Sequence, residues 1–221
     1  MKHVKLLVLA VTVSSVCSCA IDHRPEAKDN PFPLHILAIN YPGEIEDAIS
    51  SGVDVDLPDN DGFTALQYAV IYQKEASVRI LLAAGADPDA GNKEYSPLSV
   101  AAKSPNVEIV RMLLAHRANP NGRHLGRAPL HNAAIFGRAE TAGLLVACEA
   151  TDVNIQEEAT GYTPLHCAVL HGKAEVVRVL VRAGVNKEIK DRAGNTPVAL
   201  ANLRTDKTIA ALLVEPAETD R

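Results

Sequence analysis

The feature that most constrains this chain is a residue pattern that recurs about every 32 residues. The pattern is clearest in residues 163–186, which read TPLHCAVLHGKAEVVRVLVRAGVN. Its first position recurs at intervals of 32, 32, 32, 35 and 33 residues, at Phe32, Thr64, Ser96, Ala128, Thr163 and Thr196. A unit of this length cannot bury an apolar surface alone, so successive units must stack on one another into an elongated core.

Within one unit the residue types predict two short antiparallel helices. Thr163 is suited to cap the first helix, and Pro164 to occupy its first position, where a missing N–H costs nothing. Gly172 interrupts the helical pattern, and Gly184 can adopt the left-handed conformation that ends the second helix. The apolar stripe of that second helix comes from Val176, Val177, Leu180 and Val181.

The unit resembles the ankyrin repeat, whose motif is T-P-L-H-x-A. The motif is complete here as Thr163, Pro164, Leu165, His166 and Ala168. The resemblance implies an all-α fold, an ankyrin-repeat solenoid of about six helix-turn-helix repeats with β-turn fingers. The expected repeats are 31–61, 62–93, 94–125, 126–160, 161–193 and 194–215, followed by a polar tail at 216–221.

The third expected repeat departs most from the motif. Glu94, Ser99, Pro105 and Arg117 stand there where the motif has Gly, His, Gly and Gly. Its second helix should nevertheless form, because the apolar residues between positions 107 and 114 keep the helical spacing.

Residues 1–18 have the pattern of a signal peptide. Basic residues precede an apolar stretch at 6–13, which is too short to span a membrane, and small residues follow. The segment VCSC, which ends at Cys19, resembles the lipobox of bacterial lipoproteins, although Cys17 departs from the family pattern. The resemblance implies cleavage before Cys19 and lipidation of that residue. Ordinary cleavage at the same small residues is the alternative.

A lipidated Cys19 would attach the repeats to a membrane. Residues 19–30 would then form the lipidated cysteine and a polar tether. Ala20 rather than Asp follows the cysteine, which resembles the lipoproteins sorted to the outer membrane of Gram-negative cells. We therefore expect the protein in the periplasm, lipid-anchored to the outer membrane.

Composition and motif content argue against other classes of function. The formal net charge is −5, and no clustered basic segment indicates a nucleic-acid partner. The sequence has no G-x-S-x-G, H-E-x-x-H, P-loop or G-x-G-x-x-G motif. We therefore expect no enzymatic activity, no cofactor and no small-molecule substrate.

The histidines and cysteines of the repeats have structural explanations. The resemblance implies that His35, His131 and His166 form hydrogen bonds within and between repeats and bind no metal. Cys148 and Cys167 fall in different helices, whereas a disulfide needs Cα atoms within ~7 Å. They are expected to be two buried thiols.

The resemblance also implies where a protein partner binds. In ankyrin arrays the turn before the motif and the end of the first helix line the concave face. Transferring this pattern predicts a partner-binding set of Phe63, Ile71, Tyr72, Tyr95, Lys103, Arg127, Ile135, Phe136, Tyr162, Leu170, His171 and Arg204. The aromatic members should point away from the packed helices and act as interface anchors.

Two non-catalytic roles fit this organisation. Small lipoproteins with ankyrin arrays resemble immunity proteins, which bind and block a cognate toxin such as a lipase effector. The alternative is a scaffold or protective partner of a resident periplasmic protein, similar to bacterial ankyrin proteins linked to oxidative stress. The neighbouring gene would distinguish them, since a toxin gene favours the first role and a catalase gene the second.

Overall fold

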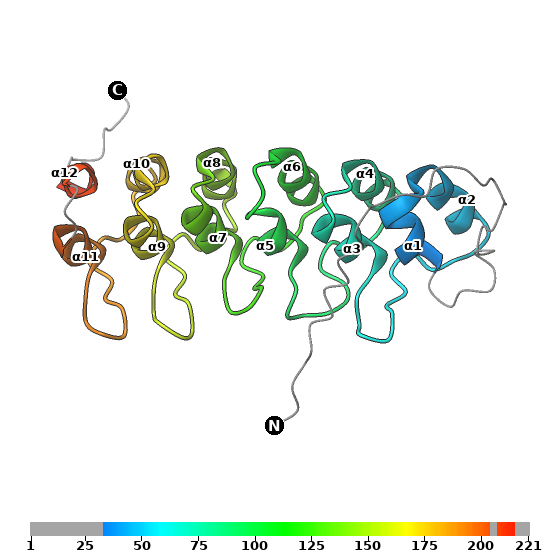
Figure 1. Cartoon of the computed structure of the whole chain (residues 1–221), viewed down its shortest axis with the longest axis horizontal. Coiled ribbons are helices and arrows are strands. Elements are labelled where there is room, and N and C mark those ends of the chain that lie inside the picture. The colour runs from blue at the N-terminus through cyan, green and yellow to red at the C-terminus, as the bar shows by residue number, and fades with distance from the viewer. Residues whose placement is uncertain (1–32, 204–206, 215–221) are drawn as a thin grey trace, which may run out of the picture.

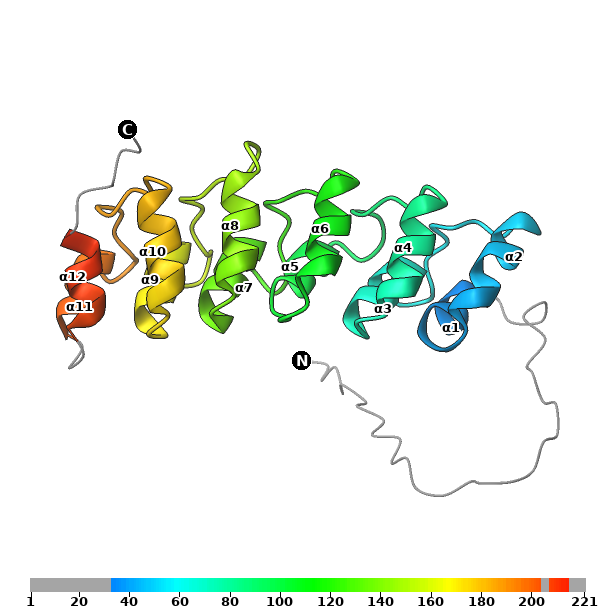
Figure 2. The same ribbon diagram turned by 90° about the horizontal axis from the view of Figure 1, so that it is seen from above.

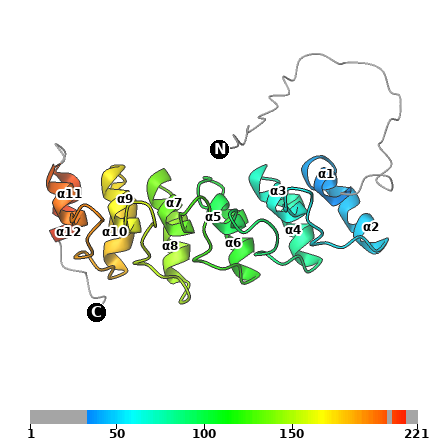
Figure 3. The ribbon, with the colours of Figure 1, turned by 90° about the horizontal axis from the view of Figure 1, so that it is seen from below.

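The computed structural model describes residues 33–203 and 207–214 of the chain. Within these residues the chain forms twelve α-helices, one 3-10 helix at Pro42–Glu44 and no strand. The helices lie in two rows that run the length of the molecule (Figure 1). Helix pairs follow one another in chain order along one axis, as the views from above and below show (Figure 2, Figure 3). The predicted all-α ankyrin solenoid is therefore confirmed.

The first helix of each pair belongs to the inner row, which is the lower row in Figure 1. These inner helices are α1 (Pro33–Asn40), α3 (Ala65–Ile71), α5 (Pro97–Ala101), α7 (Pro129–Phe136), α9 (Pro164–Leu170) and α11 (Pro197–Leu203). The outer helices are α2 (Ile45–Ser50), α4 (Glu75–Ala83), α6 (Val107–Ala115), α8 (Ala139–Ala147), α10 (Ala174–Arg182) and α12 (Thr208–Val214). The loops from each outer helix to the next inner helix extend below the inner row and form the fingers.

The inner helices begin where the sequence places their caps. The hydroxyls of Thr64 and Thr163 each accept the backbone N–H of the residue three positions later, and both residues take part in capping boxes. Ser96 caps α5 in the same way, whereas Ala128 has no side chain that can cap α7. The hydroxyl positions of the repeated motif therefore set the start of α3, α5 and α9.

The core is a continuous ladder of aliphatic side chains between the two rows. Inner helix α7 packs against α9, and outer helix α10 packs against α8 and α12. Each described repeat contributes fully buried leucine or isoleucine side chains, among them Leu34, Leu66, Leu81, Leu98, Leu113, Leu130, Leu145, Leu165, Leu180 and Ile209. The array buries its apolar surface by stacking, as the period of the sequence requires.

Polar side chains connect neighbouring repeats beside this core. His131 Nε2 donates to the Tyr162 carbonyl at 2.9 Å, and His166 Nε2 donates to the Asn195 carbonyl at 3.1 Å. His35 bonds the Phe63 carbonyl at 2.7 Å. The structural role predicted for these three histidines is therefore confirmed.

A second set of hydrogen bonds runs along the loops that follow the outer helices. The carboxylate of Asp56 accepts the backbone N–H of Asp87. Asp89 accepts in the same way from Asn119, at 2.8 Å. Farther along, Asn121 Oδ1 accepts from Asp152 and Asn154 Oδ1 from Asn186. Hydrogen bonds of these two kinds connect neighbouring repeats along most of the array, which favours a stiff array.

The two cysteines of the repeats are both free. Cys167 is buried in α9 as predicted, but Cys148 is only half-buried, because it is the residue that ends α8. None of the helices in 33–203 and 207–214 is long and apolar enough to cross a membrane. The predicted signal peptide at 1–18, Cys19, the tether at 19–30 and the tail at 216–221 lie outside the described residues.

Candidate protein-binding surface

The predicted partner-binding residues fall into two sets by their place in the repeats, a finger row and a helix-end row, which together are here called the inner face. The finger row consists of the residues just before each inner helix, Phe63, Tyr95, Arg127 and Tyr162. The helix-end row consists of the residues at the C-terminal ends of the inner helices, Ile71, Tyr72, Lys103, Ile135, Phe136, Leu170 and His171. Arg204, the last predicted member, lies outside the described residues.

The aromatic side chains of the finger row are half-buried and pack along the fingers. The rings of Phe63 and Tyr95 meet edge to face, with centroids 4.8 Å apart. Tyr95 continues the contact to His124, at 4.5 Å. Tyr162 packs against the buried core and stacks on His166 at 5.7 Å. The expectation that these aromatics point away from the packed interior is therefore wrong for Tyr162, because its ring covers the start of the inner helix.

The helix-end row is more exposed. Tyr72 is 53% exposed and Phe136 is 45% exposed, and Ile71 and Leu170 are also open to solvent. These side chains come from α3, α7 and α9, at corresponding positions of different repeats. Large apolar side chains that recur at one exposed position form a surface that a partner can cover. Tyr72 and Phe136 are the strongest anchor candidates.

Tyr68 belongs to the same surface although the motif transfer did not include it. Its hydroxyl donates a 2.8 Å hydrogen bond to Asp59 Oδ2, and its ring stacks on Tyr72 with centroids 6.4 Å apart. Burial and the bond to Asp59 raise the pKa of this phenol well above its ordinary value. The i, i+4 spacing of Tyr68 and Tyr72 on one helix was the signal that would have found it.

Charged residues interrupt both rows at one place. Lys103 at the end of α5 is half-buried, and burial, followed by the charge of Arg127, lowers the pKa of its ammonium. Arg127 Nε lies 3.1 Å from Oε1 of the buried Glu157. The hydroxyl of Thr160 donates to the other oxygen of the same carboxylate at 3.0 Å.

Structural features account for two titratable residues of the fifth repeat, His171 and Cys167. The imidazole of His171 bonds back to the Cys167 carbonyl in its own helix at 2.9 Å. Burial raises the pKa of the Cys167 thiol to about 12, so the thiol stays protonated. In the part of the chain that the structure describes, no three of the His, Cys, Asp and Glu residues are placed to hold a metal ion.

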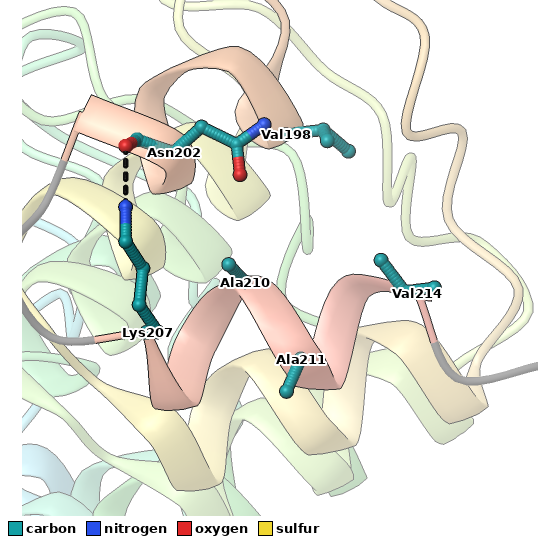
Figure 4. Close-up of a pocket in the computed structure, with 6 residues that line it drawn as sticks. All are labelled: Val198, Asn202, Lys207, Ala210, Ala211 and Val214. Carbon is teal, nitrogen blue, oxygen red and sulfur yellow. Dashed lines mark hydrogen bonds between the residues drawn. The ribbon is translucent and has the colours of Figure 1, made fainter.

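A shallow apolar groove lies at the C-terminal end of the array, between α11 and α12 (Figure 4). Its lining residues are Val198, Asn202, Lys207, Ala210, Ala211 and Val214. Lys207 Nζ donates to the Asn202 carbonyl at 2.7 Å across its edge. The groove holds no pair of side chains suited to acid-base chemistry, and it lies on the last helix pair.

These features define the class of the protein: a stacked helix-pair solenoid that presents fingers and helix ends as a binding face. The family model for ankyrin repeats matches residues 3–92, 89–157 and 130–221. The chain therefore belongs to the ankyrin repeat family. Domains of this family bind protein partners and are generally non-catalytic interaction modules.

Solved structures agree with this assignment. An ankyrin repeat domain from Acinetobacter baumannii is 31% identical, with a TM-score of 0.78, over 84% of this chain and 97% of that chain. The ankyrin repeat domain of Bcl-3, a member of the IkappaB protein family, is 27% identical, with a TM-score of 0.72, over 82% of this chain and 81% of that chain.

Curated relatives share only part of the chain. The mitochondrial disaggregases of Bos taurus and Homo sapiens are 32% and 33% identical, over 100 and 98 residues. These segments make up 45% and 44% of this chain but only 14% and 13% of those proteins. The likeness is therefore confined to a small part of the disaggregases.

Proposed function

We propose that this protein is an immunity-type inhibitor, a non-catalytic module whose inner face binds and blocks a cognate toxin such as a lipase effector. The observation that carries the proposal is the exposure of Tyr72 and Phe136 at corresponding positions of the inner face. Aromatic side chains that are left in solvent by the free protein and buried by a partner are frequent energetic anchors of interfaces.

The stiffness of the array supports an inhibitory role. His131 connects the fourth repeat, which carries Phe136, to the fifth, and His166 connects the fifth to the sixth, so this part of the face is held in place before a partner arrives. A preorganised surface loses little conformational freedom on binding, which favours tight association. Tight association is what an inhibitor of a toxin needs.

The polar groups of the array support a non-catalytic role, because structural contacts already occupy them. Asp59 and Asp191 each accept backbone N–H groups within their own fingers. Burial holds the pKa of His131 and His166 below the ordinary histidine value, and each ring bonds a carbonyl of the next repeat. These contacts stabilise the fold.

The proposed location is the periplasm, with a lipid anchor at Cys19 in the outer membrane. The lipobox-like segment before Cys19 supports this proposal, and one similar solved domain comes from a bacterium. Cys19→Ser should abolish membrane association, with Cys148→Ser as the matched control. Acyl labelling of the Cys19→Ser protein in the outer membrane would contradict the anchor.

The inhibitory role can be tested by placing a photo-crosslinking amino acid at position 136. The same group at position 79, where Arg79 is exposed on the outer helix α4, is the control. We expect a protein of the cell envelope, or a toxin added from a competitor strain, to crosslink at 136 and not at 79. The activity of the crosslinked protein is then measured with and without the ankyrin chain. Loss of that activity supports an inhibitor, whereas full activity in the complex would indicate the scaffold role.

A further inference from the structure

Two cations, Lys103 and Arg127, interrupt rows that otherwise carry mainly aliphatic and aromatic side chains, and they belong to adjacent repeats. In the helix-end row, Lys103 occupies the position that Ile71, Ile135 and Leu170 hold in other repeats. In the finger row, Arg127 occupies the position of the aromatic Phe63, Tyr95 and Tyr162. Both substitutions fall at the junction of the third and fourth repeats.

The local hydrogen bonds fix these two residues as neighbours. Ser99 lies in α5, and Lys103 follows the end of this helix. The Ser99 hydroxyl donates to the Arg127 carbonyl at 2.7 Å. Burial, and after it the charge of Arg127, lowers the pKa of Lys103, which agrees with this placement. Arg138 adds a third cation, since its Nε donates to the Lys103 carbonyl at 2.9 Å. We call Lys103, Arg127 and Arg138 the cationic junction.

Lys103 is the member of the cationic junction that lacks a counter-ion. Among residues 34–203 and 207–214, no hydrogen-bond or ion-pair partner is found for its ammonium group, whereas Arg127 is paired with Glu157. Burial alone disfavours a charged ammonium, and a neighbouring guanidinium disfavours it further. An aliphatic side chain would fill the position without this electrostatic cost, as Ile71 and Ile135 show. Packing therefore does not explain the lysine.

We propose that the cationic junction binds an acidic segment of the protein partner, whose Asp or Glu carboxylate pairs with the ammonium of Lys103. Arg127 contributes a second positive charge beside that carboxylate, and the exposed ring of Phe136 receives an adjacent apolar side chain of the partner. This inference rests on the proposed function in one respect: the partner is a protein that binds the inner face.

Charge-assisted pairing at this site gives specificity because the surroundings are partly apolar. Ile135 and Phe136 belong to the helix-end row of the adjacent repeat, so a partner segment bound there would exclude some of the water that weakens a carboxylate–ammonium contact. Glu157 is already held by Arg127 and by Thr160, so it is not available to neutralise Lys103. A neutral partner segment would leave the ammonium buried and unpaired, which costs affinity.

The test uses a phage library of random 16-residue peptides, selected on the full-length protein and on two variants. Lys103→Ile places in the third repeat the residue that two other repeats have, so folding should be retained and is checked by thermal unfolding. Arg79→Gln removes a cation from the outer surface as the matched control. We expect peptides enriched in Asp and Glu from wild type and from Arg79→Gln, and no such enrichment from Lys103→Ile.

Binding of one selected acidic peptide then gives the size of the effect. Its affinity should fall about tenfold or more in Lys103→Ile, and by a similar factor when its Glu residues are replaced by Gln. Lys103 should also titrate at higher pH in the peptide complex than in the free protein, because a nearby carboxylate favours the charged ammonium. Nuclear magnetic resonance of the lysine ε-carbon measures this change.

The other outcomes separate this inference from the proposed function. Peptides that lose affinity with Phe136→Ala but show no preference for acidic residues would overturn the cationic junction and leave the inner face as the binding surface. Failure to recover any peptide sensitive to Phe136→Ala or Tyr72→Ala would count against both proposals. Binding of phosphatidylglycerol vesicles that depends on Lys103, without binding of acidic peptides, would indicate a membrane surface and overturn the inference.

Discussion

The third and fifth repeats achieve the same helix pair with different chemistry. In the fifth repeat, His166 Nδ1 accepts the backbone N–H of Thr163, and Nε2 donates to the Asn195 carbonyl. In the third repeat, the shorter Ser99 reaches the next finger through its hydroxyl. Helix α9 has seven residues and α5 has five. The position of the inter-repeat bond is kept, although the residue that forms it differs.

The inter-repeat hydrogen bond therefore requires a donor at this position of the inner helix, and either a histidine or a serine can supply it. The difference between the two repeats also places the departures from the motif next to the cationic junction. The third repeat, which has the shortest inner helix, is also the one that presents Lys103 on the inner face.

The largest expected effect comes from removing the inter-repeat donor. His166→Ala should destabilise the fold by about 3 kcal/mol, because it leaves a cavity and the buried backbone N–H of Thr163 without a partner. Ser99→Ala should cost about 1–2 kcal/mol, since the group removed is smaller. Urea unfolding followed by circular dichroism measures both. An equal or larger loss for Ser99→Ala would contradict the comparison.

Low pH should reduce the stability that the buried histidines contribute, whereas the Ser99 hydrogen bond has no group that titrates in this range. Burial lowers the pKa of His124 to about 4 and also lowers that of His131 and His166. Below about pH 6.5 these histidines take up protons in the unfolded chain but stay neutral in the folded chain. Their contribution to the free energy of unfolding is therefore fully present above that pH and is lost as the pH falls toward 4.

We therefore expect the free energy of unfolding to decrease by about 1–2 kcal/mol between pH 7.5 and pH 5. Chemical unfolding at the two pH values measures the change. His124→Gln should show a smaller decrease, and His171→Gln, which removes an exposed histidine, is the control. Equal stability at both pH values would show that the buried histidines are not held neutral.

The smallest expected effect concerns the residues that end the outer helices. Gly184 in the fifth repeat has φ of 73°, and Arg117 in the third has φ of 64°. Gly184→Ala should destabilise by about 1 kcal/mol, because a side chain is strained in this left-handed conformation. Arg117→Gly should stabilise by about 0.5 kcal/mol, since relief of strain exceeds the added freedom of the unfolded chain. Thermal unfolding measures both, and destabilisation by Arg117→Gly would contradict the assignment of strain.

The fold was predictable from sequence because each repeat restates the same apolar columns and caps. Leu66, Leu98, Leu130 and Leu165 share one column, and all four are buried as their spacing requires. The second helix of the third repeat was predicted correctly despite the departures from the motif, because α6 keeps its apolar stripe. The helix caps, the apolar columns and the repeat spacing all indicate the same fold, and such agreement is the condition under which a sequence specifies one structure.

The binding surface was only partly predictable. The motif placed Tyr72 and Tyr162 in one set, but contacts between fingers and core make one exposed and the other half-buried. The lack of a counter-ion for Lys103 depends on Glu157, which lies far along the chain and pairs with Arg127 instead. Such choices among distant partners are decided in three dimensions and have no signal in local spacing.

The central claim is that the inner face binds a protein through its exposed aromatic residues. Calorimetric titration of Phe136→Ala with the partner captured by crosslinking tests it most directly, with a thermal melt of the same variant. We expect an affinity loss of about thirtyfold or more, because truncated anchors typically cost ~2 kcal/mol. We also expect a nearly unchanged melting temperature, since the ring is 45% exposed in the free protein. Unchanged affinity in a folded variant would contradict the claim and move the binding site away from the inner face.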